Sequence, residues 1–145
     1  PYRVGVIGLT RAPGDQPAGF EVIPAAEVLA RRVPEVGEQA DALIVLTNLS
    51  YRSSLGLARA VPGIDLVVAA LPRQLPERAV RAAETGALVI TAEQALPRHA
   101  GRRVGKLEVV IDSDGTWKDE AWKSIAMGPE FVDDPAMAVL LSKFR

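Results

Sequence analysis

Two short apolar stretches near the middle of the chain are separated by a segment with one apolar face. Residues 42–47 and 64–70 are almost wholly apolar, which is typical of strands covered on both faces of a parallel sheet. Between them, in residues 51–61, apolar positions recur at helical spacing until Pro62-Gly63 stops the pattern. The pattern therefore predicts a strand, a helix and a second strand in that order.

The rest of the chain continues this alternation. Further strands, one of them very short, are expected at residues 2–7, 20–23, 87–91 and 104–111. Helices are expected from Pro24 until Pro34 kinks or ends the first one, over residues 76–84, and over residues 136–144. Asp112-Ser113-Asp114-Gly115 predicts a hairpin turn, with residues 116–126 as the second strand of the hairpin. The sequence thus predicts one domain over residues 1–145, a layered α/β fold with a partly parallel sheet and a late hairpin.

The two tryptophans fall on the second strand of that hairpin. Trp117 and Trp122 are five positions apart, so a regular strand would place them on opposite faces. We therefore expect one of them to be exposed, and an exposed tryptophan is a mild indication of an interface.

Composition narrows the possible partners. The 145 residues are 48% hydrophobic and 24% charged, with a net charge of −1, so we expect no electrostatic attraction to nucleic acid or to an anionic membrane surface. No apolar run approaches the ~18 residues of a membrane span. The chain has no cysteine, which excludes disulfides and thiolate metal sites. Because the chain opens directly on an apolar strand, we expect it to belong to a longer protein.

Candidate chemistry lies where the two central strands end. Asn48 follows the first of them, Arg52 lies four residues on, and Arg73 follows the second. Ligands of open α/β sheets collect at the carboxyl ends of strands, where helix N-termini also offer free N–H groups. These three residues are therefore a candidate anion-binding site. The alternative is that Asn48 caps a turn and both arginines are solvated.

Three other motifs are weak indications of a nucleotide, calcium or histidine-based site. Gly5-Val6-Ile7-Gly8 lacks the glycine spacing of a dinucleotide-binding loop. The turn at residues 112–115 resembles the start of a calcium loop, but the twelfth position would be Lys123 in place of a glutamate. His99 is the only histidine and lies in a predicted loop, where we expect a surface residue.

A small flavodoxin-like domain that binds an anion or a nucleotide remains an alternative.

Several segments occur in an order and spacing typical of one family. They read VGVIGLT, ADALIVLTNLS, AVPGIDLVVAA, TGALVITAEQ, GRRVGKLEVVIDSDG and DPAMAVLLSKF. In this order they resemble the second half of the catalytic domain of the calcineurin-like metallophosphoesterases, and within that superfamily the 5'-nucleotidase group. The resemblance runs from end to end of the chain. It implies a hydrolase of phosphate esters with two divalent metals that clamp the phosphate and activate a water.

The positions at which the resemblance implies metal ligands carry other residues here. The three histidines of this half of the family domain fall on Asn48, Leu71 and Arg73. An amide oxygen is a weak ligand, a leucine side chain offers no lone pair, and arginine adds a permanent positive charge. At 4 Å and an effective dielectric constant near 20, that charge would repel a dication by ~8 kcal/mol. We therefore expect no metal ligands among these residues and no cofactor in this chain alone.

These observations lead to two functional hypotheses. The first is a degenerate phosphoesterase half-domain that acts as a scaffold or interaction module, paired with a missing N-terminal half, a fused domain or a second copy. The second is a metal-dependent phosphate-ester hydrolase whose site the missing half completes, with nucleotides as the substrates that the resemblance implies. Because members of the 5'-nucleotidase group often act outside the cytoplasm, the resemblance also implies an extracytoplasmic or periplasmic location.

Overall fold

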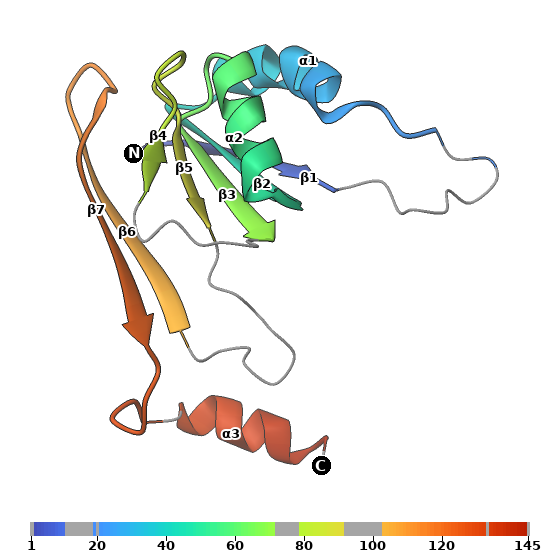
Figure 1. The fold of residues 1–145 in the computed structure, drawn as a ribbon. Helices are drawn as coiled ribbons and strands as arrows, with labels where there is room; N and C mark the ends of the chain where they lie inside the picture. The colour runs from blue at the N-terminus through green and yellow to red at the C-terminus, as the bar shows by residue number, and fades with distance from the viewer. Residues whose placement is uncertain are drawn as a thin grey trace.

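A five-stranded sheet forms the centre of the molecule (Figure 1). The computed structural model describes residues 2–10, 19, 21–71, 79–91, 103–132 and 134–144. The strands, in spatial order, are β1 (Val4–Leu9), β2 (Ala42–Ser50), β3 (Leu66–Leu71), β5 (Leu88–Thr91) and β4 (Val80–Arg81). The first four are parallel, and the short β4 pairs antiparallel with β5 at the edge. The predicted α/β class with a partly parallel sheet is confirmed.

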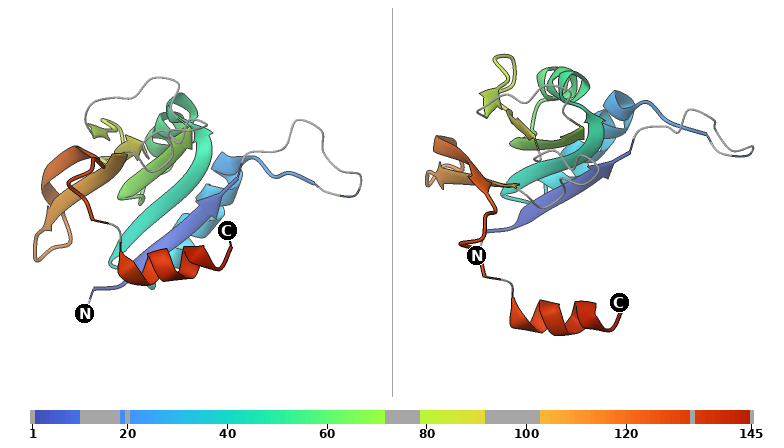
Figure 2. Two further views of the ribbon diagram at one scale, coloured as in Figure 1. Left: turned by 90° about the horizontal axis from the view of Figure 1, so that it is seen from below. Right: turned by 60° about the horizontal axis from the view of Figure 1, so that its bottom comes forward.

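Two helices cover one face of this sheet. They are α1 (Ala25–Gly37) and α2 (Tyr51–Ala60), and Figure 2 shows both on the same side of the strands. Leu29 and Val33 of α1 and Ala58 of α2 are buried against alternate residues of the strands, among them Leu43 and Val45. This alternation follows from the period of two along a strand, which places Leu43 and Val45 on the helix side.

A long hairpin covers part of the opposite face. Its strands are β6 (Arg103–Ile111) and β7 (Trp117–Ala126). Leu107, Trp117 and Trp122 of the hairpin pack on a second apolar cluster formed by Leu66, Leu88 and Ile90. The hairpin therefore lies over β3 and β5.

The described residues leave uncovered much of this face along β1 and at the end of β2, although Ile44 of β2 packs on the cluster below the hairpin. Val4, Val6 and Leu46 point to the hairpin side of the sheet, because Val6 pairs with Ile44 and Leu46 pairs with Gly8 in the parallel register. All three side chains are exposed. We call Val4, Val6 and Leu46 the open sheet face.

The tryptophans do not lie on opposite faces of β7, so that prediction is wrong. Both are half-buried and both contact the Leu66 cluster. The cause is a shift in register, since Glu108 pairs with Ala121 but Val110 pairs with Lys118. One extra residue on β7 reverses the alternation between the two rings, as a β-bulge does.

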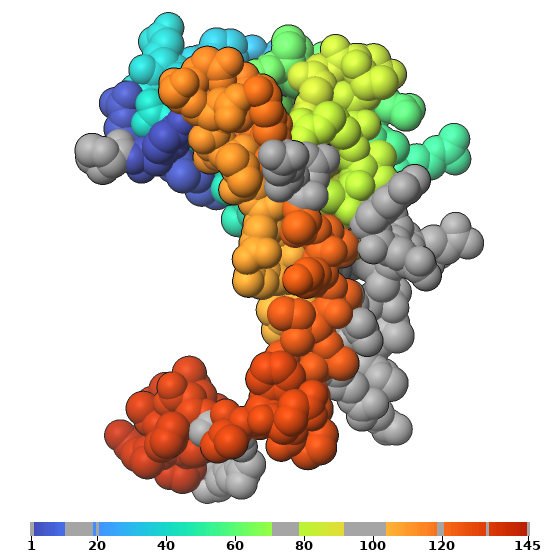
Figure 3. Space-filling model, turned by 90° about the vertical axis from the view of Figure 1, so that its left-hand side faces the viewer, coloured from blue at the N-terminus to red at the C-terminus, as the bar shows by residue number. Residues whose placement is uncertain are grey.

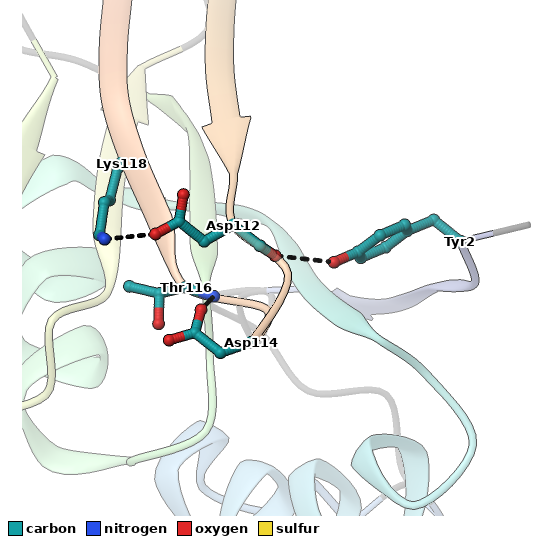
Figure 4. Close-up of polar contacts among 5 residues, drawn as sticks. All are labelled: Tyr2, Asp112, Asp114, Thr116 and Lys118. Atoms are coloured by element: carbon teal, nitrogen blue, oxygen red, sulfur yellow. Dashed lines mark hydrogen bonds and ion pairs between the residues drawn. The ribbon is translucent and has the colours of Figure 1, made fainter.

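The hairpin turn forms at residues 112–115 as predicted, and polar contacts fix it (Figure 4). Gly115 N–H donates to the Asp112 carbonyl over 2.9 Å, and Lys118 forms an ion pair with the Asp112 carboxylate. Thr116 N–H donates to Asp114 Oδ1 over 2.9 Å. The hydroxyl of Tyr2 reaches the Asp112 carbonyl at 3.5 Å, so the segment before β1 touches the hairpin tip.

The last helix stands apart from the sheet. α3 (Pro135–Ser142) is capped by Asp134, whose carboxylate accepts the N–H groups of Ala136 and Met137, as the sequence predicts. None of its residues is buried. Figure 3 shows a hollow between α3 and the body of the molecule, with the hairpin along one side.

Three local predictions differ from the structure of the described residues, one of them only in part. The helix expected at residues 76–84 is absent from residue 79 onward, where β4 and a turn lead into β5, closed by Gly86 N–H donating to the Ala82 carbonyl. Pro34 does not end α1, which was one of the two outcomes expected there: the helix continues three residues beyond it, and Val33 and Val36 pack on the core. Glu21 to Ile23 form no strand. Residue 20 and residues 76–78 lie outside the described part of the chain.

Candidate functional site

The carboxyl ends of β1, β2 and β3 meet at one edge of the sheet and line an open, shallow pocket of about 470 Å³. Its lining is mostly apolar and comes from all three strand ends: Gly8, Leu9, Thr10, Leu46, Thr47, Asn48, Val68 and Ala70. Parallel strands bring their carboxyl ends to the same edge, which is where ligands of open α/β sheets bind. The pocket is continuous with the open sheet face, since Leu46 belongs to both.

The polar side chains that the described residues contribute to the pocket are neutral and hydrogen-bonded. Asn48 Nδ2 donates to Thr10 Oγ1 over 3.1 Å. Thr47 is buried, and its hydroxyl accepts the N–H of Leu49 over 3.0 Å. An amide and hydroxyls can orient a polar ligand through hydrogen bonds, but they supply neither a charge nor a general base of suitable pKa.

The structure, where it describes the chain, does not bring the predicted anion-binding residues together. Asn48 lines the pocket, whereas Arg52 is exposed in the first turn of α2 and does not line it. At the N-terminus of α2, Ser50 Oγ accepts the N–H of Ser53 over 3.1 Å, so one of the free donors is already satisfied. Arg73 lies outside the described residues.

Of the three positions at which the resemblance implies metal ligands, the structure describes two, Asn48 and Leu71. Leu71 is the last residue of β3 and pairs with Ser50 of β2, at the same edge as Asn48. No group of three or more His, Cys, Asp or Glu side chains that could hold a metal ion occurs among the residues that the structure describes. His99, like Arg73, lies outside them.

Thr10 is the residue of the site that sequence reasoning did not single out. It directly follows β1, which pairs in parallel with β2. A polar residue after one parallel strand is a candidate neighbour for a polar residue after the next. That signal, applied to residues 10 and 48, would have identified the pair.

A second pocket of about 330 Å³ lies between the hairpin tip and the start of β3. Its charged side chains stabilise the fold: Asp65 accepts the N–H of Leu43, Asp114 that of Thr116, and Arg81 donates to the Gly86 carbonyl over 2.8 Å. Burial raises the pKa of the Asp65 carboxyl, although the hydrogen bond from Leu43 opposes the shift. We interpret this pocket as structural.

The glycine motif in β1 has a packing role. A Cβ at Gly5 would overlap Val36 of α1 and approach Ala40 to 3.1 Å, so Gly5 allows the helix to lie close to the strand. Gly5 therefore faces α1. This arrangement gives no support to a phosphate-binding loop.

Comparisons with known proteins give matches among solved structures. The sequence matches no known family in a family scan and no curated protein. One similar structure is a 5'-nucleotidase precursor from Thermus thermophilus, with a TM-score of 0.75 and 26% identity over 97% of this chain. Another is the sulfate thiohydrolase SoxB from the same species, in complex with glycerol, with a TM-score of 0.78 and 17% identity over 99% of this chain.

These matches confirm the resemblance to the 5'-nucleotidase group that the sequence indicates, and the SoxB match supports the fold alone. The chain covers 31% of the 5'-nucleotidase chain and 26% of the SoxB chain. No described helix has the length and apolar character that a bilayer crossing requires.

Proposed function

We propose that this chain, which has the fold of part of a 5'-nucleotidase-like metallophosphoesterase, is a non-catalytic interaction module. The observation that carries the proposal is the composition of the pocket at the carboxyl ends of β1, β2 and β3. Among the residues that the structure describes, its polar groups are the neutral Thr10, Thr47 and Asn48, and the remaining lining is apolar. Such a pocket is suited to an apolar or neutral polar group of a partner.

Two-metal phosphoester hydrolysis needs ligands that are not found among the described residues at this edge of the sheet. Each dication requires imidazole or carboxylate ligands in a preorganised geometry. Asn48 is hydrogen-bonded to Thr10 instead. The resemblance implies that Leu71 and Arg73 occupy the other two positions, and a guanidinium there would repel a dication.

The open sheet face supports the interaction role. Val4, Val6 and Leu46 are 55%, 56% and 45% exposed, beside a pocket whose lining is mostly apolar. Contiguous exposed apolar surface of this kind is typical of a site that another polypeptide covers. We infer that the open sheet face is the interaction surface of the module.

Activity measurements test this proposal. The purified chain is assayed against a phosphodiester and a nucleoside monophosphate, with Mn²⁺ or Zn²⁺ added. We expect the parent chain and an Asn48→Ala variant to have the same rate of hydrolysis, because the site contributes no metal-bound nucleophile. Metal-dependent hydrolysis that the Asn48→Ala change abolishes would contradict the proposal.

A second candidate is a phosphate-ester hydrolase that another polypeptide segment completes. The position of the pocket at the carboxyl ends of the strands favours this alternative. The small share of the 5'-nucleotidase chain that this chain covers also favours it. Metal-dependent activity that appears only when a second segment is added would select this candidate.

The extracytoplasmic location remains part of the proposal. The similar 5'-nucleotidase is described as a precursor, which is compatible with an exported protein. Fractionation of cells that express the complete natural protein, with detection in the periplasm or the medium, tests this location. Recovery in the cytoplasm alone would contradict it.

A further inference from the structure

We draw no further inference here: the strongest candidate, the pocket between the hairpin tip and the start of β3, belongs to the packing already described, because its charged side chains already form hydrogen bonds of the fold and the indole N–H of Trp117, for which the described residues supply no acceptor, is inaccessible to solvent.

Discussion

Asp65 and Leu43 are joined by two hydrogen bonds at the start of β3. The Asp65 carboxylate accepts the backbone N–H of Leu43 over 2.7 Å, and Asp65 N–H donates to the Leu43 carbonyl over 3.0 Å. The Asp65 carbonyl in turn accepts the N–H of Leu88 over 2.8 Å. This one residue therefore connects β2, β3 and β5 at the amino end of the sheet, opposite the candidate site.

Removing the Asp65 carboxylate should destabilise the fold. In an Asp65→Ala variant the N–H of Leu43, a residue that is 2% exposed, loses its acceptor. A buried unpaired N–H costs about 1–3 kcal/mol, and we expect a loss of this size in the free energy of unfolding in urea. Asp65→Asn retains an acceptor oxygen and is the matched control. Equal losses in the two variants would contradict this role for the carboxylate.

The same residue should give a distinct pH dependence. Burial holds the pKa of Asp65 above its usual range in the folded state, whereas the unfolded-state pKa is about 3.9. The protonated carboxyl therefore stabilises the fold below the unfolded-state pKa, and this contribution is lost as the pH rises through the folded-state pKa. The unfolding free energy of the parent minus that of Asp65→Asn should fall from acidic to neutral pH. A difference that rises over this range would show that the shift has the opposite sign.

The glycine at residue 105 should be required for the packing of the hairpin. A Cβ at Gly105 would overlap the indole ring of Trp122, whereas one at Gly8 of β1 would meet nothing within 4 Å. We expect Gly105→Ala to lower the free energy of unfolding by about 1–2 kcal/mol, as other overpacked sites do. Gly8→Ala is the strand control, with a change within about 0.5 kcal/mol.

The fluorescence of Trp117 and Trp122, the only two tryptophans, reports on the hairpin directly. Gly105→Ala should expose the rings and shift their emission to longer wavelength. Stability and emission identical to those of Gly8→Ala would show that Trp122 rotates away freely.

Histidines at residues 71 and 73 should create metal affinity if these residues occupy the ligand positions that the resemblance implies. We expect a Leu71→His/Arg73→His variant to bind Mn²⁺ or Zn²⁺ at least about tenfold more tightly than the parent, or about 1.4 kcal/mol. One new imidazole replaces the Leu71 side chain, which has no lone pair, and the other replaces the positively charged Arg73. The control with equal histidine content is Val104→His/Val110→His, on exposed positions of β6. Equal affinities for the two variants in calorimetry would contradict the assignment.

The sequence indicates the parallel sheet well and the irregular parts poorly. The apolar runs of β2 and β3 are unambiguous, because both faces of these strands carry apolar side chains. The alternation of β7 misleads because a bulge shifts the register between Trp117 and Trp122. The expected helix at residues 76–84 is replaced by β4 from residue 80, because pairing of Val80 with Val89 outweighs local helical spacing.

The candidate site could be predicted only in part. Asn48 follows the strand predicted over residues 42–47 and lies near the end of β2 in the structure, and the same argument would have identified Thr10, which follows β1. Whether Val4 and Val6 are covered is not encoded in their own residue types, because a buried and an uncovered sheet face have the same alternation. That distinction depends on where the hairpin lies, and the hairpin covers β3 and β5 but not β1.

Metal stoichiometry tests the central claim most directly. The full chain is equilibrated with Mn²⁺ and Zn²⁺, freed of loosely bound ions on a desalting column and analysed by plasma mass spectrometry. A non-catalytic module should retain a small fraction of one ion per chain. Two ions per chain, together with hydrolysis of a phosphate ester, would contradict the claim.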